Sequence, residues 1–157
     1  MKKIYIRLIL ILLSLLWIAF IFSNSLENAR ESGEKSTWVY ELVNNIFPGI
    51  TPLFIRKMAH FTEFAILGFL FSSSAVSFAR PSIGKRIYIY ATVALPPSFI
   101  VAATDEFIQR FSEGRHSSFT DVLIDTAGAL FGIIAFVALI FIIRYIKNRT
   151  SKKQQST

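Results

Sequence analysis

The sequence predicts an all-α polytopic membrane protein with four transmembrane helices and a short amphipathic helix between the first two. Hydrophobic residues make up 53% of the 157 residues, and only 17% are charged. The mean hydropathy of +0.51 exceeds that of most soluble domains. The apolar residues gather in four stretches, and ~20 residues at ~1.5 Å per residue cross the ~30 Å hydrocarbon core of a bilayer. Lipid offers a bare backbone no hydrogen-bond partner, so such stretches are expected to be helical.

The first span has some features of a secretory signal peptide. Lys2, Lys3 and Arg7 precede its apolar run, as basic residues do in secretory signals. The run is long for a signal peptide, and Ser23-Asn24-Ser25 is not a small-x-small cleavage site, so we expect an uncleaved span. All four spans belong to a single domain at residues 1–147. We place them at about residues 4–23, 56–79, 87–106 and 121–144.

The connection between the first and second spans, residues 24–51, is the longest. Its first part is charged, and its second part has apolar residues with i, i+3, i+4, i+7 spacing, which predicts an amphipathic helix. We expect this helix to lie in the outer interface with Trp38 and Tyr40 at headgroup level, and to end at Pro48-Gly49. The apolar residues with this spacing are Val39, Leu42, Val43 and Ile46.

Prolines mark the second and third long helices. Thr51-Pro52 has the pattern of an N-cap followed by proline at the first helical position, so the second long helix is expected to start there. Pro96-Pro97 falls inside the third span. The pair removes two backbone donors and predicts a kink, for which packing is a better explanation than a gating hinge.

The charges predict the orientation of the spans. With the N-terminus inside, eleven of the 17 Lys and Arg residues lie on the inner side, and all ten acidic residues lie on or just beneath the outer side. This distribution agrees with the positive-inside rule and places both termini in the cytoplasm. The basic tail, residues 148–157, is expected to be cytoplasmic, without fixed structure and attracted to anionic lipid. The inner basic residues are Lys2, Lys3, Arg7, Arg80, Lys85, Arg86, Arg144, Lys147, Arg149, Lys152 and Lys153.

Ionisable side chains from three predicted helices reach the same depth. Glu63 lies about 25 Å from Arg80 along a helix, and Asp125 about 28 Å from Arg144, at ~1.5 Å per residue. Both carboxyls therefore lie about a turn below the outer interface, where an unpaired charge costs on the order of 1–3 kcal/mol. We expect the cluster to form a polar pocket open to the outside. Its candidate residues are Lys57, His60, Glu63, Asp105, Glu106, Gln109, Arg115, Asp121 and Asp125.

Three interpretations of this cluster stay open. The groups can pair and hold the helices in register. They can form a catalytic or ligand-binding pocket, with His60 as acid or base, Glu63 or Asp105 orienting its ring, and Arg115 binding an anion such as phosphate. They can also bind a metal through His60 and Glu63 at i, i+3 with further carboxylates. No spacing here is diagnostic of a metal, so our site prediction names no metal and no cofactor.

The fourth span combines the acidic residues with glycines. Asp121, Asp125, Gly128 and Gly132 occupy one helical face, and Gly128-x-x-x-Gly132 is a pattern that allows helices to approach closely. Other classes of site are excluded or disfavoured. The chain has no cysteine, which excludes disulfides and thiolate metal sites. Its basic residues stand at helix ends and in the tail, so no nucleic-acid role is expected.

These polar motifs resemble those of the VanZ-like family of bacterial membrane proteins. The order and spacing fit over roughly residues 20–134, and the motifs are spread over three segments, which makes the resemblance specific. Asp125 departs from the family, which commonly has Asn there. The matching segments are Arg56-Lys57-Met58-Ala59-His60-Phe61-Thr62-Glu63-Phe64, Asp105-Glu106-Phe107-Ile108-Gln109-Arg110-Phe111, Gly114-Arg115, Ser118-Phe119-Thr120-Asp121-Val122, Gly128 and Gly132.

The resemblance implies a location and a process rather than a reaction. The family is named for a protein that raises resistance to the glycopeptide teicoplanin, so it implies a bacterial plasma membrane and a cell-envelope role. A glycopeptide antibiotic or a lipid-linked wall precursor is then the expected partner beside the bilayer. The alternatives are a membrane-embedded enzyme acting on a phosphorylated or glycosylated envelope lipid and a structural or accessory protein. A transporter is disfavoured, because the inner halves of the spans are nearly free of ionisable residues.

Overall fold

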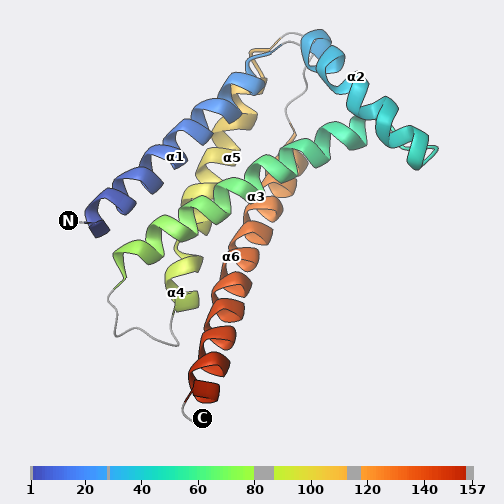
Figure 1. Cartoon of the computed structure of the whole chain (residues 1–157). Coiled ribbons are helices and arrows are strands. Elements are labelled where there is room, and N and C mark those ends of the chain that lie inside the picture. The colour runs from blue at the N-terminus through green and yellow to red at the C-terminus, as the bar shows by residue number, and fades with distance from the viewer. Residues whose placement is uncertain (1, 28, 80–86, 113–117, 155–157) are drawn as a thin grey trace.

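A computed structural model describes residues 2–27, 29–79, 87–112 and 118–154. In these ranges the secondary structure is helical, and four stretches are long and apolar enough to cross a membrane. The all-α prediction with four spans is therefore confirmed. The helices, shown in Figure 1, are α1 (Lys2–Ser25), α2 (Ala29–Ile46), α3 (Pro52–Phe78), α4 (Ile87–Thr92), α5 (Leu95–Gln109) and α6 (Phe119–Gln154).

The outer surface of the bundle is apolar, as a lipid-facing surface must be. On α1, Leu8, Leu12 and Leu16 are each more than half exposed. Large apolar side chains on α6 are exposed in the same way, among them Phe131 and Ile142. A water-soluble bundle would bury such residues, so their outward position supports insertion in a bilayer.

The helix between the first two spans is longer than predicted. α2 starts at Ala29, so the charged first part of the connection, which the apolar spacing left outside the predicted helix, is helical as well. This segment is rich in Glu, Lys and Arg, which have high helix propensity. α2 packs against α3, and its Leu42 and Ile46 are more than half exposed. Its place in the membrane interface stays a prediction, and the side chain of Trp38 lies outside the described residues.

The turn into α3 has the predicted proline start. Thr51 is the N-cap, its Oγ1 accepts a hydrogen bond from the Phe54 amide at 3.2 Å, and Pro52 is the first helical residue. Gly49 has φ of +97°, a conformation that side-chain-bearing residues rarely adopt. The chain therefore reverses between α2 and α3 at a glycine.

The third span is interrupted where the prolines predicted a kink. α4 ends at Thr92, and α5 begins at Leu95, directly before Pro96-Pro97. The two prolines stand in the first turn of α5, where their missing amide donors leave no intrahelical bond unmade. The predicted kink is thus a break between two helices.

α3 and α6 touch backbone to backbone. A Cβ added to Gly68 would lie 2.1 Å from the carbonyl oxygen of Ala129. A Cβ added to Gly128 would lie 2.3 Å from the carbonyl oxygen of Phe61, and one added to Gly132 would lie 1.8 Å from that of Ala65. No real Cβ atom fits at these distances, so glycine is what permits the crossing. Gly68, on α3, completes the contact and was not singled out in the sequence.

The far end of the bundle joins the start of α1 to the end of α3. Arg7 donates from Nε to the Ser77 carbonyl oxygen at 3.0 Å, and its guanidinium lies over the Phe78 ring. The turn with Arg80, Lys85 and Arg86 lies outside the described residues. The expectation of an unstructured tail is wrong up to Gln154, because α6 continues through it. Lys, Arg and Gln propagate an existing helix well.

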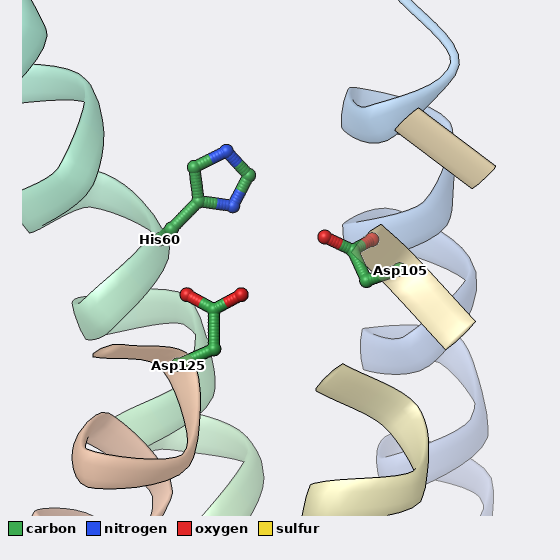
Figure 2. A group of neighbouring side chains, drawn as sticks. All are labelled: His60, Asp105 and Asp125. Atoms are coloured by element: carbon green, nitrogen blue, oxygen red, sulfur yellow. The ribbon is translucent and has the colours of Figure 1, made fainter. Parts of the chain in front are cut away.

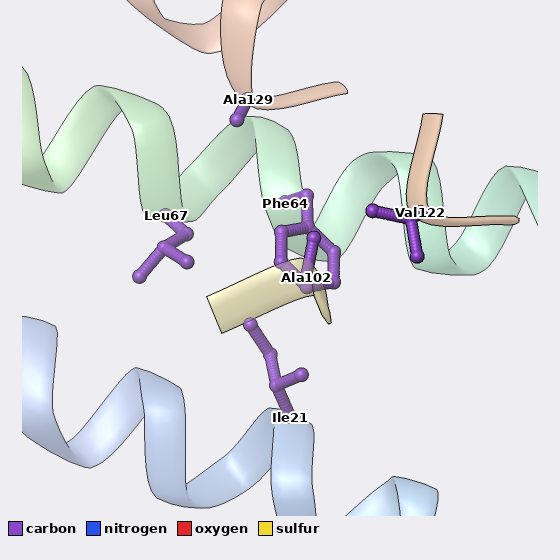
Figure 3. Close-up of a cluster of buried hydrophobic side chains, with 6 residues drawn as sticks. All are labelled: Ile21, Phe64, Leu67, Ala102, Val122 and Ala129. Carbon is purple, nitrogen blue, oxygen red and sulfur yellow. The ribbon is translucent and has the colours of Figure 1, made fainter. Parts of the chain in front are cut away.

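An apolar core fills the bundle beneath the polar end. Phe64 and Leu67 of α3 are fully buried, and side chains of α1, α5 and α6 meet them (Figure 3). The core therefore fixes the relative positions of the four spans that carry the polar side chains. Its members are Ile21, Phe64, Leu67, Ala102, Val122 and Ala129.

Candidate functional site

The C-terminal ends of α1 and α5 and the N-terminal ends of α3 and α6 meet at one end of the bundle, here called the polar end. Every predicted site residue that the structure describes lies here. Arg115, the predicted anion-binding residue, lies outside the described residues. The residues brought to the polar end are Lys57, His60 and Glu63 of α3, Asp105, Glu106 and Gln109 of α5, and Asp121 and Asp125 of α6.

Asp105 is held by a buried network between α1 and α5. Its side chain is fully buried. Ser25 donates from Oγ to Asp105 Oδ1 at 2.6 Å, and Gln109 donates from Nε2 to Asp105 Oδ2 at 2.9 Å. Ser112 donates from Oγ to the Ser25 carbonyl oxygen at 2.7 Å. Both carboxylate oxygens thus have donors, and these fix the orientation of the group.

Glu63 is also held by side chains of α1. Asn24 donates from Nδ2 to Glu63 Oε1 at 2.9 Å, and Trp17 donates from Nε1 to the Glu63 carbonyl oxygen at 2.8 Å. The other carboxylate oxygen, Oε2, lies 3.6 Å from Nδ1 of His60. Glu63 therefore lies between α1 and the imidazole, and its predicted role in orienting the ring stays a prediction.

The start of α6 is tied to both α3 and α5. Lys57 of α3 pairs with Asp121 in the first turn of α6. Glu106 of α5 accepts a hydrogen bond from the Ser118 amide, one residue before α6 begins. A carboxylate at a helix N-terminus is favoured by the free amides and by the helix dipole. These contacts place Asp125, one turn further along α6, next to α3 and α5.

His60, Asp105 and Asp125 form a compact group. One potential ligand atom from each side chain lies within 4.8 Å of the other two. In Figure 2 the His60 ring and the Asp125 carboxylate stand together, and the Asp105 carboxylate faces them from the other side. Asp105 is 0% exposed and Asp125 2% exposed. The group combines an imidazole, which can transfer a proton, with two buried carboxyls.

A small cavity opens beside this group. Its volume is about 30 Å³, which is the space of about one water molecule. It joins basic side chains at its rim to carboxyl groups, an arrangement that suits part of an anion or a hydrated ion. Its lining residues are Arg56, Lys57, His60, Glu106, Gln109, Asp121, Ile124 and Asp125.

A larger crevice of about 220 Å³ lies between α5 and α6. Three phenylalanines, Phe99, Phe107 and Phe119, line it together with Ala103, Val122 and the charged Arg110 and Glu106. Glu106 also lines the small cavity. The exposed phenylalanine side chains mark the crevice as lipid-facing. Glu106 is therefore part of the wall of both the polar cavity and the lipid-facing crevice.

The contribution of α1 was missing from the sequence analysis. Asn24 and Ser25 were considered only as part of a cleavage site, yet they bind Glu63 and Asp105. Trp17 and Ser112 were missed as well. Their signal was weak: small polar residues at the end of an apolar span are common at any membrane interface. The position of Asn24 and Ser25 at the same depth as the acidic groups could have indicated that they contact them.

The comparison with protein families agrees with the motifs. The family model described as VanZ/LLP1 matches residues 10–144, which include most of α1, all of α2 to α5 and most of α6. No curated protein and no solved structure shows a significant match to the chain. The match covers more than half of the chain, and the protein therefore belongs to the VanZ/LLP1 family.

Proposed function

We propose that this VanZ/LLP1 family member acts at the outer face of the bacterial plasma membrane, where it binds the anionic headgroup of a lipid-linked wall precursor. Binding there changes the response of the cell envelope to glycopeptides such as teicoplanin. The observation that carries the proposal is the gathering of Arg56, Lys57 and His60 around one cavity at the polar end. A phosphate on a lipid headgroup is the anion that such cations bind.

The orientation is part of the proposal. Eleven basic residues belong to the side of the termini, and six to the side of the polar end. The positive-inside rule then supports cytoplasmic termini and a polar end that faces outward. Wall precursors and glycopeptides meet on that same outer side.

Cysteine labelling tests the orientation, because the natural chain has no cysteine to give a background. Glu41→Cys on α2 should react with a membrane-impermeant maleimide in intact cells. Ser151→Cys near the end of α6 should react only after the cells are opened. The reverse pattern would place the polar end in the cytoplasm and end the proposal.

Lateral access supports a lipid as the ligand. The crevice between α5 and α6 lies on the lipid-facing side, and Glu106 lines both the crevice and the cavity. We propose that a headgroup arriving within the bilayer reaches Arg56 and Lys57 past Glu106, a path that a free soluble anion does not need. The apolar crevice would contact the hydrocarbon chain.

Teicoplanin susceptibility in a sensitive host is the direct measurement. Expression of the wild-type chain should raise the inhibitory concentration, and Arg56→Ala should remove the rise because the rim loses a phosphate-binding cation. Arg149→Ala, which removes the same charge at the opposite end of the molecule, is the matched control and should keep the rise. No change in susceptibility with confirmed wild-type expression would contradict the proposal.

The second candidate is an enzyme that acts on a phosphorylated or glycosylated envelope lipid. His60 favours it, because its side chain is 17% exposed, lies against Glu63 and reaches the cavity. An imidazole oriented by a carboxylate and open to a cavity can serve as general acid or base. In this interpretation Glu63 or Asp105 is predicted to orient the ring, and Arg115 to bind an anion such as phosphate.

This candidate is tested with purified protein and phosphorylated lipid extracted from the host, with release of phosphate as the readout. His60→Ala and Asp105→Ala should each abolish release, and Arg115→Ala should do the same if that residue binds the phosphate. Each variant is checked by gel filtration in detergent. If the three variants only lower the yield of folded protein, the cluster maintains the fold and the enzyme interpretation is wrong.

A further inference from the structure

We propose that His60, Asp105 and Asp125 bind a divalent transition-metal ion, with Zn²⁺ as the first candidate. No diagnostic metal spacing is present along the chain, because the three ligands come from three different helices. Only the fold brings them together, with their ligand atoms within 4.8 Å of one another. The proposal goes beyond the proposed function and is tested without it.

The ligand atoms of His60, Asp105 and Asp125 are close enough to bind one metal ion after small side-chain movements. Zinc–ligand bonds of ~2.0–2.1 Å in a tetrahedral site place ligand atoms roughly 3.3 Å apart. The three atoms must therefore approach by at most roughly 1.5 Å, which small side-chain rotations provide. The adjoining cavity of about 30 Å³ is lined by His60 and Asp125 and has room for an ion with one water ligand.

Asp125 supplies an independent reason for a cation at this position. The other four carboxyls of the polar end have partners: Asn24 for Glu63, Ser25 and Gln109 for Asp105, the Ser118 amide for Glu106, and Lys57 for Asp121. Asp125 is 2% exposed, and in the part of the chain that the structure describes no side chain or amide donates to its carboxylate. The carboxylate points toward His60 in Figure 2.

The neighbouring carboxyls make a negative charge on Asp125 costly, although Arg56 and Lys57 line the same cavity. Asp105, Glu106, Asp121 and Glu63 all act on Asp125 with the same sign of charge. Carboxylates buried together repel one another and lose hydration. A divalent ion cancels the two negative charges of Asp105 and Asp125, while neutral His60 adds a ligand and no charge.

The supporting contacts are of the kind that metal ligands have. Ser25 and Gln109 hold both oxygens of Asp105, and Glu63 stands 3.6 Å from the His60 ring. Such outer contacts orient ligands and raise their affinity. The imidazole also limits the choice of ion, because Mg²⁺ and Ca²⁺ prefer all-oxygen sites, whereas Zn²⁺ binds nitrogen and carboxylate together.

The test is metal binding by the full-length chain in detergent. Protein stripped with a chelator is dialysed against Zn²⁺, and bound metal is counted by atomic emission. Co²⁺ is then substituted, and its absorption in the visible range reports ligand geometry. We expect one ion per chain, a tetrahedral or five-coordinate cobalt spectrum, and a melting temperature that rises with Zn²⁺ concentration, because a ligand of the folded state stabilises it.

Asp125→Asn is the decisive variant because the amide keeps the shape of the side chain and removes its charge. It should weaken Zn²⁺ binding at least tenfold and lose the metal-dependent rise in melting temperature while remaining folded. His60→Gln gives a second ligand deletion. Glu41→Gln, an exposed carboxylate on α2, is the matched control and should bind as the wild type does.

Two results would overturn the metal site. One is a wild-type chain without stoichiometric Zn²⁺ or Co²⁺ after dialysis. The other is an Asp125→Asn variant that binds Zn²⁺ with wild-type affinity, which would assign the ion to surface carboxylates. Neither result bears on teicoplanin susceptibility, so failure of the metal site and failure of the proposed function can be told apart.

Discussion

The polar end and the apolar half of the bundle are held together in different ways. At the polar end, side chains of α1, α3, α5 and α6 contact one another through hydrogen bonds and an ion pair. In the apolar half, Gly68 and Gly132 let α3 and α6 touch through their backbones. Helices in lipid gain little from hydrophobic burial, so they rely on close packing and on polar contacts. In this protein the close packing lies in the apolar half and the polar contacts lie at the polar end.

The difference shows what each layer is for. Because the glycine crossing leaves no room for a Cβ, the apolar half depends on close contact between backbones. Polar contacts between helices in membranes average only about 0.6 kcal/mol each and reach ~1–2 kcal/mol in model peptides. The polar end should therefore tolerate the loss of one contact better than the apolar half tolerates an added side chain.

The largest effect is expected in the apolar half. Gly132→Val would force a Cβ to within 1.8 Å of the Ala65 carbonyl oxygen, so α3 and α6 must separate. Overpacking costs ~1–3 kcal/mol in adaptable cores and more where the neighbour is backbone. We expect a loss of at least ~3 kcal/mol and little folded protein, measured by gel filtration in detergent. Ala127→Val, on the exposed side of α6, should keep wild-type yield, and equal yields for both variants would contradict the backbone contact.

The next effect separates stability from function at the polar end. Asp105→Ala leaves the Ser25 hydroxyl and the Gln109 amide without their acceptor. A buried donor that loses its partner costs ~1–3 kcal/mol. His60→Ala should change stability by less than ~1 kcal/mol and still remove the teicoplanin phenotype. The unfolding free energy in detergent and the susceptibility of the host provide the two readouts.

A double-mutant cycle sharpens this prediction. If His60 and Asp105 act in one site, the double variant should lose no more function than either single variant. Because their ligand atoms lie within 4.8 Å of each other, their stability losses should also depart from additivity by at least ~0.5 kcal/mol. Strictly additive losses of function would mean that the two residues act separately. A large stability loss in His60→Ala would instead favour a purely structural cluster.

The fold was predictable from the sequence to the extent that it depends on local patterns. Four long apolar stretches gave the spans, and Thr51-Pro52 gave the start of α3. The length of α2 was underestimated, because apolar periodicity marks only its second part, whereas the helix propensity of its charged residues extends it to Ala29. The tail was misjudged for a similar reason: its charge was visible, but the continuation of α6 depends on the helix that precedes it.

The site was predictable in its acidic and histidine residues, which are conspicuous in apolar surroundings. Their partners were not, because Ser25 contacts Asp105 across 80 residues of sequence and only the fold sets that distance. Gly68 could not be predicted either, because it belongs to no glycine pattern in the sequence and only the fold places Ala129 against it. Proximity between helices was the missing information in each case.

A smaller effect is expected at the rim of the polar end. Lys57 and Asp121 form a pair whose side chains remain about one-third exposed, and such pairs contribute ~0.2–1 kcal/mol. Lys57→Met should therefore lower the unfolding free energy by less than ~1 kcal/mol, but should weaken teicoplanin protection through the loss of a phosphate-binding cation. Thermal unfolding and host susceptibility measure the two effects. A variant with wild-type susceptibility would remove Lys57 from the proposed binding site.

The smallest effect tests the far end of the bundle, where one polar contact supports the apolar half. Arg7 donates from Nε to the Ser77 carbonyl oxygen, in the last turn of α3, and stacks over Phe78. Arg7→Lys keeps the charge but loses the planar guanidinium that makes both contacts at once. We expect a loss of ~0.5–1 kcal/mol in detergent unfolding with no change in teicoplanin susceptibility. Arg149→Lys, whose stacking on Tyr145 is exposed, should fall within error, and an altered susceptibility in Arg7→Lys would show that function is not confined to the polar end.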